Sequence, residues 1–333
     1  MLRAMPGLED VRVRLERVRA AARHIDPAFV NTPLTACPPL SDALGCGINL
    51  KVETLNPVRC FKGRGTDVVV ASAHERGNRH LVCASAGNLG QALAYSARRH
   101  DLEVTVVAGQ TASPLKLERV AAFGAHVRLA GNDIEDARAV AREIAEAEGA
   151  RLVEDSLDLE TCEGAATVGL ELAESGAAMD VVLVALGGGA LASGVGAVLG
   201  SVADDVETVA IQPLGAPAMA LSWQLGSVMN TDQTDTIADG VAGRFPIPEV
   251  LADLLIVLDD VLLVREQSIK MGMRLLYEHA GLVVEPSAAL GVAALLENPE
   301  RFAGRQVTTI VCGSNVAPAD FARWVLSPID EMS

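Results

Sequence analysis

Residues 181–203 read VVLVALGGGALASGVGAVLGSVA, an apolar stretch without a charged residue. Its length meets the roughly 20 residues that a membrane-spanning helix needs. However, Gly187, Gly188 and Gly189 each weaken a continuous helix by about 1 kcal/mol, and the β-branched residues of 181–186 are typical of a buried strand. The stretch therefore predicts a strand, a glycine loop and a helix rather than a membrane span.

The same alternation of short apolar runs and longer amphipathic ones continues on both sides of this stretch. LVCAS (81–85) precedes a helix predicted from Asn88, EVTVVA (103–108) one near Ser113, and HVRLA (126–130) one from Asp133. The other predicted strands are RLVED (151–155), TVAIQP (208–213), LLIVLDD (254–260) and VTTIVCG (307–313). Strands that alternate with helices indicate parallel sheets covered on both faces.

The remaining segments carry weaker signals. Charges interrupt every apolar run of residues 1–24, which predicts an amphipathic helix and not a secretory leader. Residues 231–248 are rich in turn formers and predict an irregular loop. The six cysteines show no CxxC pairing, so we expect a protein of the reducing cytoplasm.

Charge and composition exclude several classes of partner. The chain of 333 residues has 43 acidic and 27 basic side chains, a formal net charge of −16. Such a surface repels nucleic acid and anionic membranes, and few aromatic residues are present to stack on bases. Any anionic ligand must therefore be held by local geometry, and we expect a small-molecule partner.

Four glycine-containing turns lie at the ends of predicted strands. They are NPVRCFKGRG (56–65), SAGNLGQ (85–91), GGGALASG (187–194) and CGSN (312–315). In open α/β sheets, ligands bind at the carboxyl ends of the strands, where helix N-termini offer unpaired N–H groups to anions. We expect the four turns to form one pocket.

The glycine run by itself permits more than one interpretation. Gly187, Gly189 and Ala192 match the dinucleotide pattern GxGxxA, but the next strand ends in Gln212 where a nicotinamide site needs an acidic residue. The run can also be a simple tight turn or a phosphate site.

Lys62 stands beside two glycines, Gly63 and Gly65, and ahead of a predicted apolar helix, TDVVVASA (66–73). A lysine withdrawn from water is a usable amine nucleophile and base, whereas most lysines are solvated surface charges. The sequence pattern leaves both interpretations open.

Six ordered segments resemble one family. They are KVETLNPVRCFKGRGTD (51–67), CASAGNLGQALA (83–94), ALGGGALASG (185–194), TIADGVA (236–242), VEPSAAL (284–290) and VCGSN (311–315). Their order and spacing are similar to those of fold-type II pyridoxal-phosphate enzymes, above all the serine/threonine dehydratases, with serine racemase close by. The resemblance implies a tryptophan synthase beta-like α/β fold with two open, mostly parallel, twisted sheets. It also implies a large domain of residues 1–68 and 155–333, with a small domain of 69–154 inserted.

The resemblance also assigns roles at the cofactor. Lys62 would form the internal Schiff base and later remove the substrate Cα proton, with Phe61 packed beside it. Asn88 would hydrogen-bond the ring hydroxyl, and Cys312 would lie against the pyridine nitrogen. The backbone of the glycine loop would cradle the phosphate, and further residues would flank the cofactor or hold the substrate carboxylate. The loop residues are Gly187, Gly188, Gly189, Ala190 and Leu191; the flanking residues are Gly240 and Glu285; the carboxylate-binding residues are Ser85, Ala86, Gly87, Asn88 and Leu89.

A neutral Cys312 makes the ring a weaker electron sink than a carboxylate partner would, which favours prompt β-elimination over a long-lived carbanion. The resemblance thus implies dehydration of a β-hydroxy-α-amino acid such as threonine, serine or a larger analogue, giving a 2-oxo acid and ammonia. β-Replacement, racemisation, a nicotinamide oxidoreductase and cofactor binding without turnover stay as alternatives. By resemblance we also expect a homodimer and, because the sequence ends soon after CGSN, no regulatory domain.

Several residues depart from the family pattern. Ala86 replaces the serine of the racemases, so efficient racemisation is not expected; Cys60 replaces a serine, and Ala190 a fourth glycine. Gln212 and Ala218 stand where metal-dependent relatives have acidic ligands, so no metal is expected.

Two further positions permit two interpretations each. Glu154-Asp155-Ser156 either favours a substrate with an amine or an extra hydroxyl, or is a solvated acidic turn. Arg59 is either a pocket-rim group or a surface charge.

Overall fold

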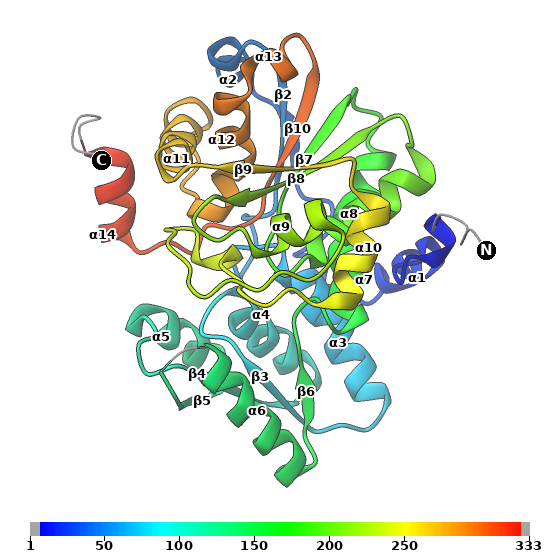
Figure 1. Cartoon of the computed structure of the whole chain (residues 1–333). Coiled ribbons are helices and arrows are strands. Elements are labelled where there is room, and N and C mark those ends of the chain that lie inside the picture. The colour runs from blue at the N-terminus through cyan, green and yellow to red at the C-terminus, as the bar shows by residue number, and fades with distance from the viewer. Residues whose placement is uncertain (1–6, 133, 328–333) are drawn as a thin grey trace.

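The computed structural model describes residues 7–132 and 134–327. It contains a six-stranded and a four-stranded sheet, with helices packed around both (Figure 1). The larger sheet lies in the upper half of Figure 1 and the smaller sheet, with helices α4, α5 and α6, in the lower half. The predicted α/β class with two mostly parallel sheets is confirmed.

The larger sheet has the strand order β1-β2-β10-β7-β8-β9. β1 runs antiparallel to β2, and the other pairs are parallel. Val311 at the end of β10 pairs with Val52 at the end of β2, so the segments that follow these two strands start side by side. The strands are β1 Leu34–Ala36, β2 Gly47–Val52, β7 Val181–Ala185, β8 Glu207–Pro213, β9 Asp260–Val264 and β10 Gln306–Val311.

The smaller sheet is entirely parallel, in the order β5-β4-β3-β6. Its strands are β3 His80–Ala84, β4 Glu103–Ala108, β5 His126–Leu129 and β6 Arg151–Val153. All four lie within residues 80–153, inside the segment predicted to be the inserted domain.

The helices connect successive strands, as the alternation in the sequence predicts. The α-helices are α1 Leu15–Ala21, α2 Pro38–Leu44, α3 Lys62–Glu75, α4 Asn88–Ala97, α5 Pro114–Ala122, α6 Ile134–Glu148, α7 Leu159–Glu174, α8 Ala190–Val202, α9 Ala218–Leu225, α10 Pro248–Val257, α11 Glu266–Ala280, α12 Leu290–Glu297, α13 Pro299–Phe302 and α14 Pro318–Phe321. The short turns are η1 Leu8–Asp10, η2 Arg98–His100, η3 Asp239–Val241, η4 Pro286–Ala289 and η5 Ala322–Leu326.

Residues 181–203 form the predicted strand, glycine loop and helix. β7 is buried on both faces at the centre of the main hydrophobic core, which explains its unbroken β-branched run. Helix α8 follows directly after Gly189. Within the two described ranges, no helix is long and apolar enough to cross a membrane.

One predicted strand is wrong, one predicted helix begins earlier than expected, and the predicted start of another helix lies outside the described residues. LLIVLDD (254–260) is not a strand: helix α10 continues to Val257, and β9 begins only at Asp260. A short apolar run does not distinguish a buried strand from a buried helix, because both present apolar residues continuously. The apolar helix predicted from Thr66 begins four residues earlier, at Lys62. The start predicted at Asp133 lies outside the described residues, and α6 is described from Ile134.

Residues 1–24 also do not form one helix. Residues 1–6 lie outside the described part, and the rest contains η1 and α1 with a non-helical segment between them. Val11 and Val13 in that segment are both buried in the core. Their spacing of two residues is that of extended backbone, which places alternate side chains on one face.

Candidate active site

A cavity of about 830 Å³ is lined by residues that follow strands of both sheets. It contains the turns after β3, β6 and β7, the start of α3 and the segment after β10. Every predicted site residue lines it, and the structure therefore brings all of them together. They are Phe61, Lys62, Ser85, Ala86, Gly87, Asn88, Leu89, Gly187, Gly188, Gly189, Ala190, Leu191, Gly240, Glu285 and Cys312.

Lys62 is the first residue of helix α3, and its ammonium is held by a carboxylate. Lys62 Nζ lies 2.8 and 2.6 Å from the two carboxylate oxygens of Asp155. It also lies 4.6 Å from the centre of the Phe61 ring. The lysine side chain is 17% and the aspartate side chain 31% exposed, so both reach the cavity and neither is sealed from water. The sequence singled out Asp155 only as part of an acidic turn, because 93 residues separate the pair.

A buried set of charges anchors the same helix two residues further on. Arg64 Nε lies 2.8 Å from Glu53 Oε2, and Arg64 Nη1 lies 2.7 Å from Glu171 Oε1. Lys51 Nζ lies 2.5 Å from Glu171 Oε2. Burial alone would raise the pKa of Glu171, but hydrogen bonds and charge from Arg64 and Lys51 outweigh it and lower the pKa to about 2. We call Lys51, Glu53, Arg64 and Glu171 the sealed cluster, because Lys51, Glu53 and Arg64 are at most 3% exposed; Glu171, at 16%, lies at its edge.

The segment after β10 packs against the start of α3 and fixes Cys312. The Phe61 N–H donates to the Cys312 carbonyl at 3.0 Å, and Cys60 pairs with Gly313 in an isolated bridge. Burial, reinforced by the Glu285 charge, raises the pKa of the Cys312 thiol well above its usual range. Cys312 is therefore a neutral thiol at neutral pH.

Asn88, the first residue of α4, is held by two groups distant in sequence. Its Nδ2 donates to Glu285 Oε1 at 2.9 Å, and its Oδ1 accepts from Asn315 Nδ2 at 2.7 Å. The Asn315 backbone N–H donates to Glu285 Oε2 at 2.9 Å, which closes the network. Burial and the nearby Asp239 raise the pKa of Glu285, although these hydrogen bonds oppose the shift.

This network leaves the Asn88 amide with hydrogen-bonding capacity. One Nδ2 proton is used by Glu285, so the second Nδ2 proton is a spare donor. Sequence analysis did not identify Asn315 as a site residue, although it is the last residue of the quoted CGSN turn.

The loop between β7 and α8 has room for an anion but not for side chains. A Cβ on Gly188 would lie 2.6 Å from Ser156 Oγ, and one on Gly189 would lie 2.4 Å from Val250 Cγ1. Gly189 adopts φ +107°, which favours glycine. Ala190 begins helix α8, a conformation that alanine adopts without strain, but its N–H donates to Ser156 Oγ at 3.1 Å. A glycine cradle at the N-terminus of a 13-residue helix fits a phosphate group.

The turn after β3 carries the residues expected to bind the substrate carboxylate, and it lines the cavity. The Gly87 N–H donates to Ser85 Oγ at 3.2 Å, and a Cβ on Gly90 would lie 2.2 Å from the Ser85 carbonyl. The turn therefore depends on glycine to fold back over the start of α4. Ser85, Ala86 and Gly87 are all partly exposed to the cavity.

Other charged residues of the cavity wall form ion pairs. Arg142 Nη2 lies 2.6 Å from Glu154 Oε1, and Arg138 pairs with Glu135. Lys116 of α5 pairs with Asp239 of η3.

The structure shows where Arg59 and Gln212 lie. Arg59 is exposed and is not part of the cavity lining, which favours the surface interpretation. Gln212 is buried, and its Oε1 accepts from the Ala220 N–H at 2.8 Å. In the described part of the chain, no group of three or more His, Cys, Asp or Glu residues is placed to hold a metal ion.

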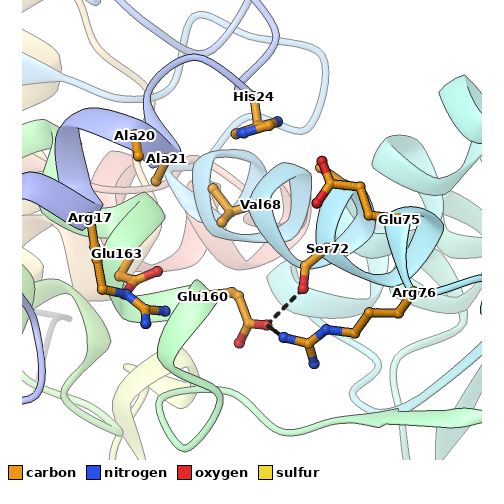
Figure 2. A pocket seen from close by; sticks show the side chains of 11 residues that line it. Arg17, Ala20, Ala21, His24, Val68, Ser72, Glu75, Arg76, Glu160 and Glu163 are labelled. Atoms are coloured by element: carbon orange, nitrogen blue, oxygen red, sulfur yellow. Dashed lines mark hydrogen bonds and ion pairs between the residues drawn. The ribbon is translucent and has the colours of Figure 1, made fainter.

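A second, smaller cavity of about 270 Å³ lies between α1, α3 and α7 (Figure 2). Figure 2 shows Glu160 between Ser72 and Arg76, and Arg17 beside Glu163. None of the predicted site residues lines this cavity. Arg17 pairs with Glu163 and Arg76 with Glu160, so these four charges satisfy one another.

Comparison with known proteins gives consistent matches. The family model described as "Pyridoxal-phosphate dependent enzyme" matches residues 25–313. The biosynthetic L-threonine dehydratase of Bacillus subtilis is 31% identical over 312 residues, 92% of this chain and 74% of that protein. The L-threonine ammonia-lyase of Thermotoga maritima is 32% identical over 305 residues, 91% and 76% of the two chains. The solved structure of maize serine racemase has a TM-score of 0.87 at 28% identity and covers 92% of this chain and 95% of its own.

Proposed function

The chain belongs to the family of pyridoxal-phosphate dependent enzymes, and we propose that it dehydrates a β-hydroxy-α-amino acid to a 2-oxo acid and ammonia. One observation carries the proposal: Lys62 faces a cavity that also contains a glycine cradle for a phosphate and a second glycine turn for a carboxylate. Curated relatives at 31% and 32% identity, named as a threonine dehydratase and a threonine ammonia-lyase, support it.

The residues present fit pyridoxal phosphate at its two polar ends. We propose that the backbone N–H groups of residues 187–191 hold the phosphate, because the helix N-terminus attracts anions. The Ala190 N–H would exchange its present partner, Ser156 Oγ, for the phosphate. Asn88 would donate its spare Nδ2 proton to the ring hydroxyl, and the Cys312 thiol would face the ring nitrogen. When bound through Lys62, the cofactor supplies an electron-withdrawing ring that acidifies the Cα–H bond of an amino acid.

Lys62 is proposed to act as the base for this proton. Lys62 is the first residue of a helix whose first turn is anchored by the sealed cluster. The backbone that carries the base therefore has a fixed position. The Ser85–Leu89 turn would hold the substrate carboxylate and thereby direct Cα toward Lys62 Nζ. The electron pair of the Cα–H bond forms the Cα=Cβ bond, and the β-oxygen leaves as water after it gains a proton.

Racemisation is the second candidate, since maize serine racemase shares the fold. It requires a second proton donor on the opposite face of Cα, and Ala86 has no such group. The neutral Cys312 also disfavours a long-lived carbanion, which racemisation needs. Both observations support elimination over racemisation.

The test joins a chemical mapping to a product assay. The absorbance spectrum of the purified protein is recorded before and after borohydride reduction, and the reduced protein is digested and mapped by mass. We expect the cofactor mass on Lys62, and 2-oxo acid and ammonia from a β-hydroxy amino acid. Cofactor on another lysine, or formation of a D-isomer or a β-substituted amino acid in place of the oxo acid, would refute the proposal.

Three expectations on organisation complete the proposal. The strands of the smaller sheet support residues 69–154 as an inserted small domain. The cytoplasmic location and the homodimer stay predictions.

A further inference from the structure

Asp155 has a contact that the proposed reaction must change. Among the described residues, Lys62 Nζ is the hydrogen-bond donor to both oxygens of its carboxylate, at 2.8 and 2.6 Å. If Lys62 carries the cofactor, its nitrogen is no longer a free alkylammonium. Asp155 then lacks its cation both while Lys62 carries the cofactor and while the released Lys62 is the neutral amine that acts as the base.

The neighbouring carboxylates of the cavity wall differ from Asp155, because their cations do not take part in the proposed reaction. Glu154, Glu135 and Asp239 pair with Arg142, Arg138 and Lys116, none of which the proposed chemistry uses. Glu285 also lines the cavity, but both of its oxygens accept hydrogen bonds, from Asn88 Nδ2 and the Asn315 N–H. Of these carboxylates, Asp155 is therefore the one whose partner the proposed chemistry removes, which leaves it to bind a cation from outside the protein. A half-buried carboxylate without its counter-ion is costly, and a charge-assisted hydrogen bond from a ligand relieves that cost.

The turn that carries Asp155 is held in place from both sides. The Glu154 N–H donates to Asp158 Oδ2 at 3.0 Å, and the Ser156 N–H donates to Thr161 Oγ1 at 3.0 Å. Ser156 Oγ also accepts from the Ala190 N–H at 3.1 Å, which ties the turn to the glycine loop. Because the contacts of Glu154 and Ser156 with Asp158 and Thr161 do not involve the Asp155 side chain, the backbone that carries the carboxylate keeps its position when the partner of Asp155 changes.

Distance then decides which part of a substrate Asp155 meets. Cα must approach Lys62 Nζ to lose its proton, and Asp155 is in direct contact with that nitrogen. Substituents on Cβ and Cγ therefore lie within a few ångströms of the carboxylate, roughly the reach of a hydrogen bond. The Lys62 ammonium itself shows that the position accepts an alkylammonium.

We propose that Asp155 determines specificity for a β-hydroxy-α-amino acid whose side chain carries a protonated amine. The inference rests on the proposed function for the identity of the reacting bonds. The carboxylate binds the side-chain ammonium, and this ammonium stays on the product while the β-oxygen leaves as water.

The direct test is a charge series with the holoenzyme. Threonine, 2,4-diamino-3-hydroxybutyrate and 3-hydroxyaspartate share the β-hydroxyl and differ mainly in a neutral, cationic or anionic side chain. We expect kcat/KM for the cationic compound to exceed that for threonine by about tenfold or more, mainly through KM, with the anionic compound poorest. Equal values for the three, or a preference for the anion, would overturn the inference.

Two variants distinguish a role of Asp155 in substrate specificity from a role in holding Lys62. Asp155→Asn keeps the shape and removes the charge, and should reduce the preference for the cationic compound to within about twofold. Glu154→Gln removes the neighbouring charge, already balanced by Arg142, and should keep the preference. If Asp155→Asn lowers turnover of all three compounds by the same factor, Asp155 acts on Lys62 and the inference is wrong.

A binding experiment keeps the inference separate from the proposed function. 2,4-Diaminobutyrate and 2-aminobutyrate have no β-hydroxyl to lose and differ by the side-chain ammonium. Calorimetry should show the diamino acid binding about tenfold more tightly to the wild type and about equally to Asp155→Asn. This preference without elimination from any amino acid would refute the proposed function and keep the inference, whereas elimination without the preference would do the reverse.

Discussion

Lys62 and Arg64 are two residues apart at the start of one helix, and each pairs with carboxylates, yet their surroundings differ. The Arg64 guanidinium is fully buried and bonded to Glu53, Glu171, Thr167 and Thr32. The Lys62 ammonium pairs with one carboxylate at the edge of a cavity. A sealed cation needs several fixed partners to offset its desolvation, so it serves structure. A cation with one partner and access to solvent can exchange that partner, so it is available for chemistry.

The largest effect is expected at the open pair. Lys62→Ala should lower turnover by at least about 10⁴-fold, roughly 5.5 kcal/mol, because it removes the proposed base and the attachment point. The free energy of unfolding should change by less than about 1 kcal/mol, since water solvates Asp155 in the variant. Steady-state rates and urea unfolding measure the two quantities. Wild-type turnover in the variant would refute the role of Lys62.

The sealed cluster should behave in the opposite way. Arg64→Met leaves Glu53 buried without its cation and should lower the free energy of unfolding by about 3–5 kcal/mol. Arg76→Met is the matched control: Arg76 is 66% exposed and 3.7 Å from Glu160, and such surface pairs contribute about 0–1 kcal/mol. Urea titrations compare the two variants. Similar losses of unfolding free energy in the two variants would mean that burial does not distinguish the Arg64–Glu53 pair from the Arg76–Glu160 pair.

Acid should weaken the sealed cluster within a defined pH window. The pKa of Glu171 is lowered to about 2 from the usual 4.5, so its ionised form stabilises the fold above pH 4.5 and this stability is lost as pH falls toward 2. The shift of about 2.5 units corresponds to roughly 3 kcal/mol. We expect the difference in stability between wild type and Glu171→Gln to be full at pH 7 and to shrink below pH 4.5. A difference that is constant from pH 7 to 3 contradicts the assigned pairing.

Metal removal should have the smallest effect. Lysine and arginine side chains balance Glu53 and Glu171, and Gln212 uses its oxygen on a backbone N–H. We therefore expect turnover to change by less than about twofold when a chelator is added, with no recovery on adding Mg²⁺. Loss of activity with chelator and its return with Mg²⁺ would show that a cation site was missed.

Local patterns predicted most of the sheet strands because buried parallel strands are nearly continuous apolar runs. They failed at 254–260, where an apolar helix gives the same pattern, and at 1–24, where Val11 and Val13 are buried in extended backbone. The glycine turns could also be identified from the sequence, since each one follows a strand and precedes a helix. Asn315 was missed because its role depends on Asn88, 227 residues earlier in the chain.

The sequence by itself determined the class of fold, because glycine turns and strand periodicity are local properties of the backbone. The cofactor family and the candidate lysine followed from the resemblance of six ordered segments to a known family. The tertiary structure decided which charges are sealed and which are open. Asp155 meets Lys62 across 93 residues, and Glu285 meets Asn88 across 197. A carboxylate stabilises the fold or remains available to a ligand according to how many partners surround it and how much water reaches it. Both are set only when distant strands assemble.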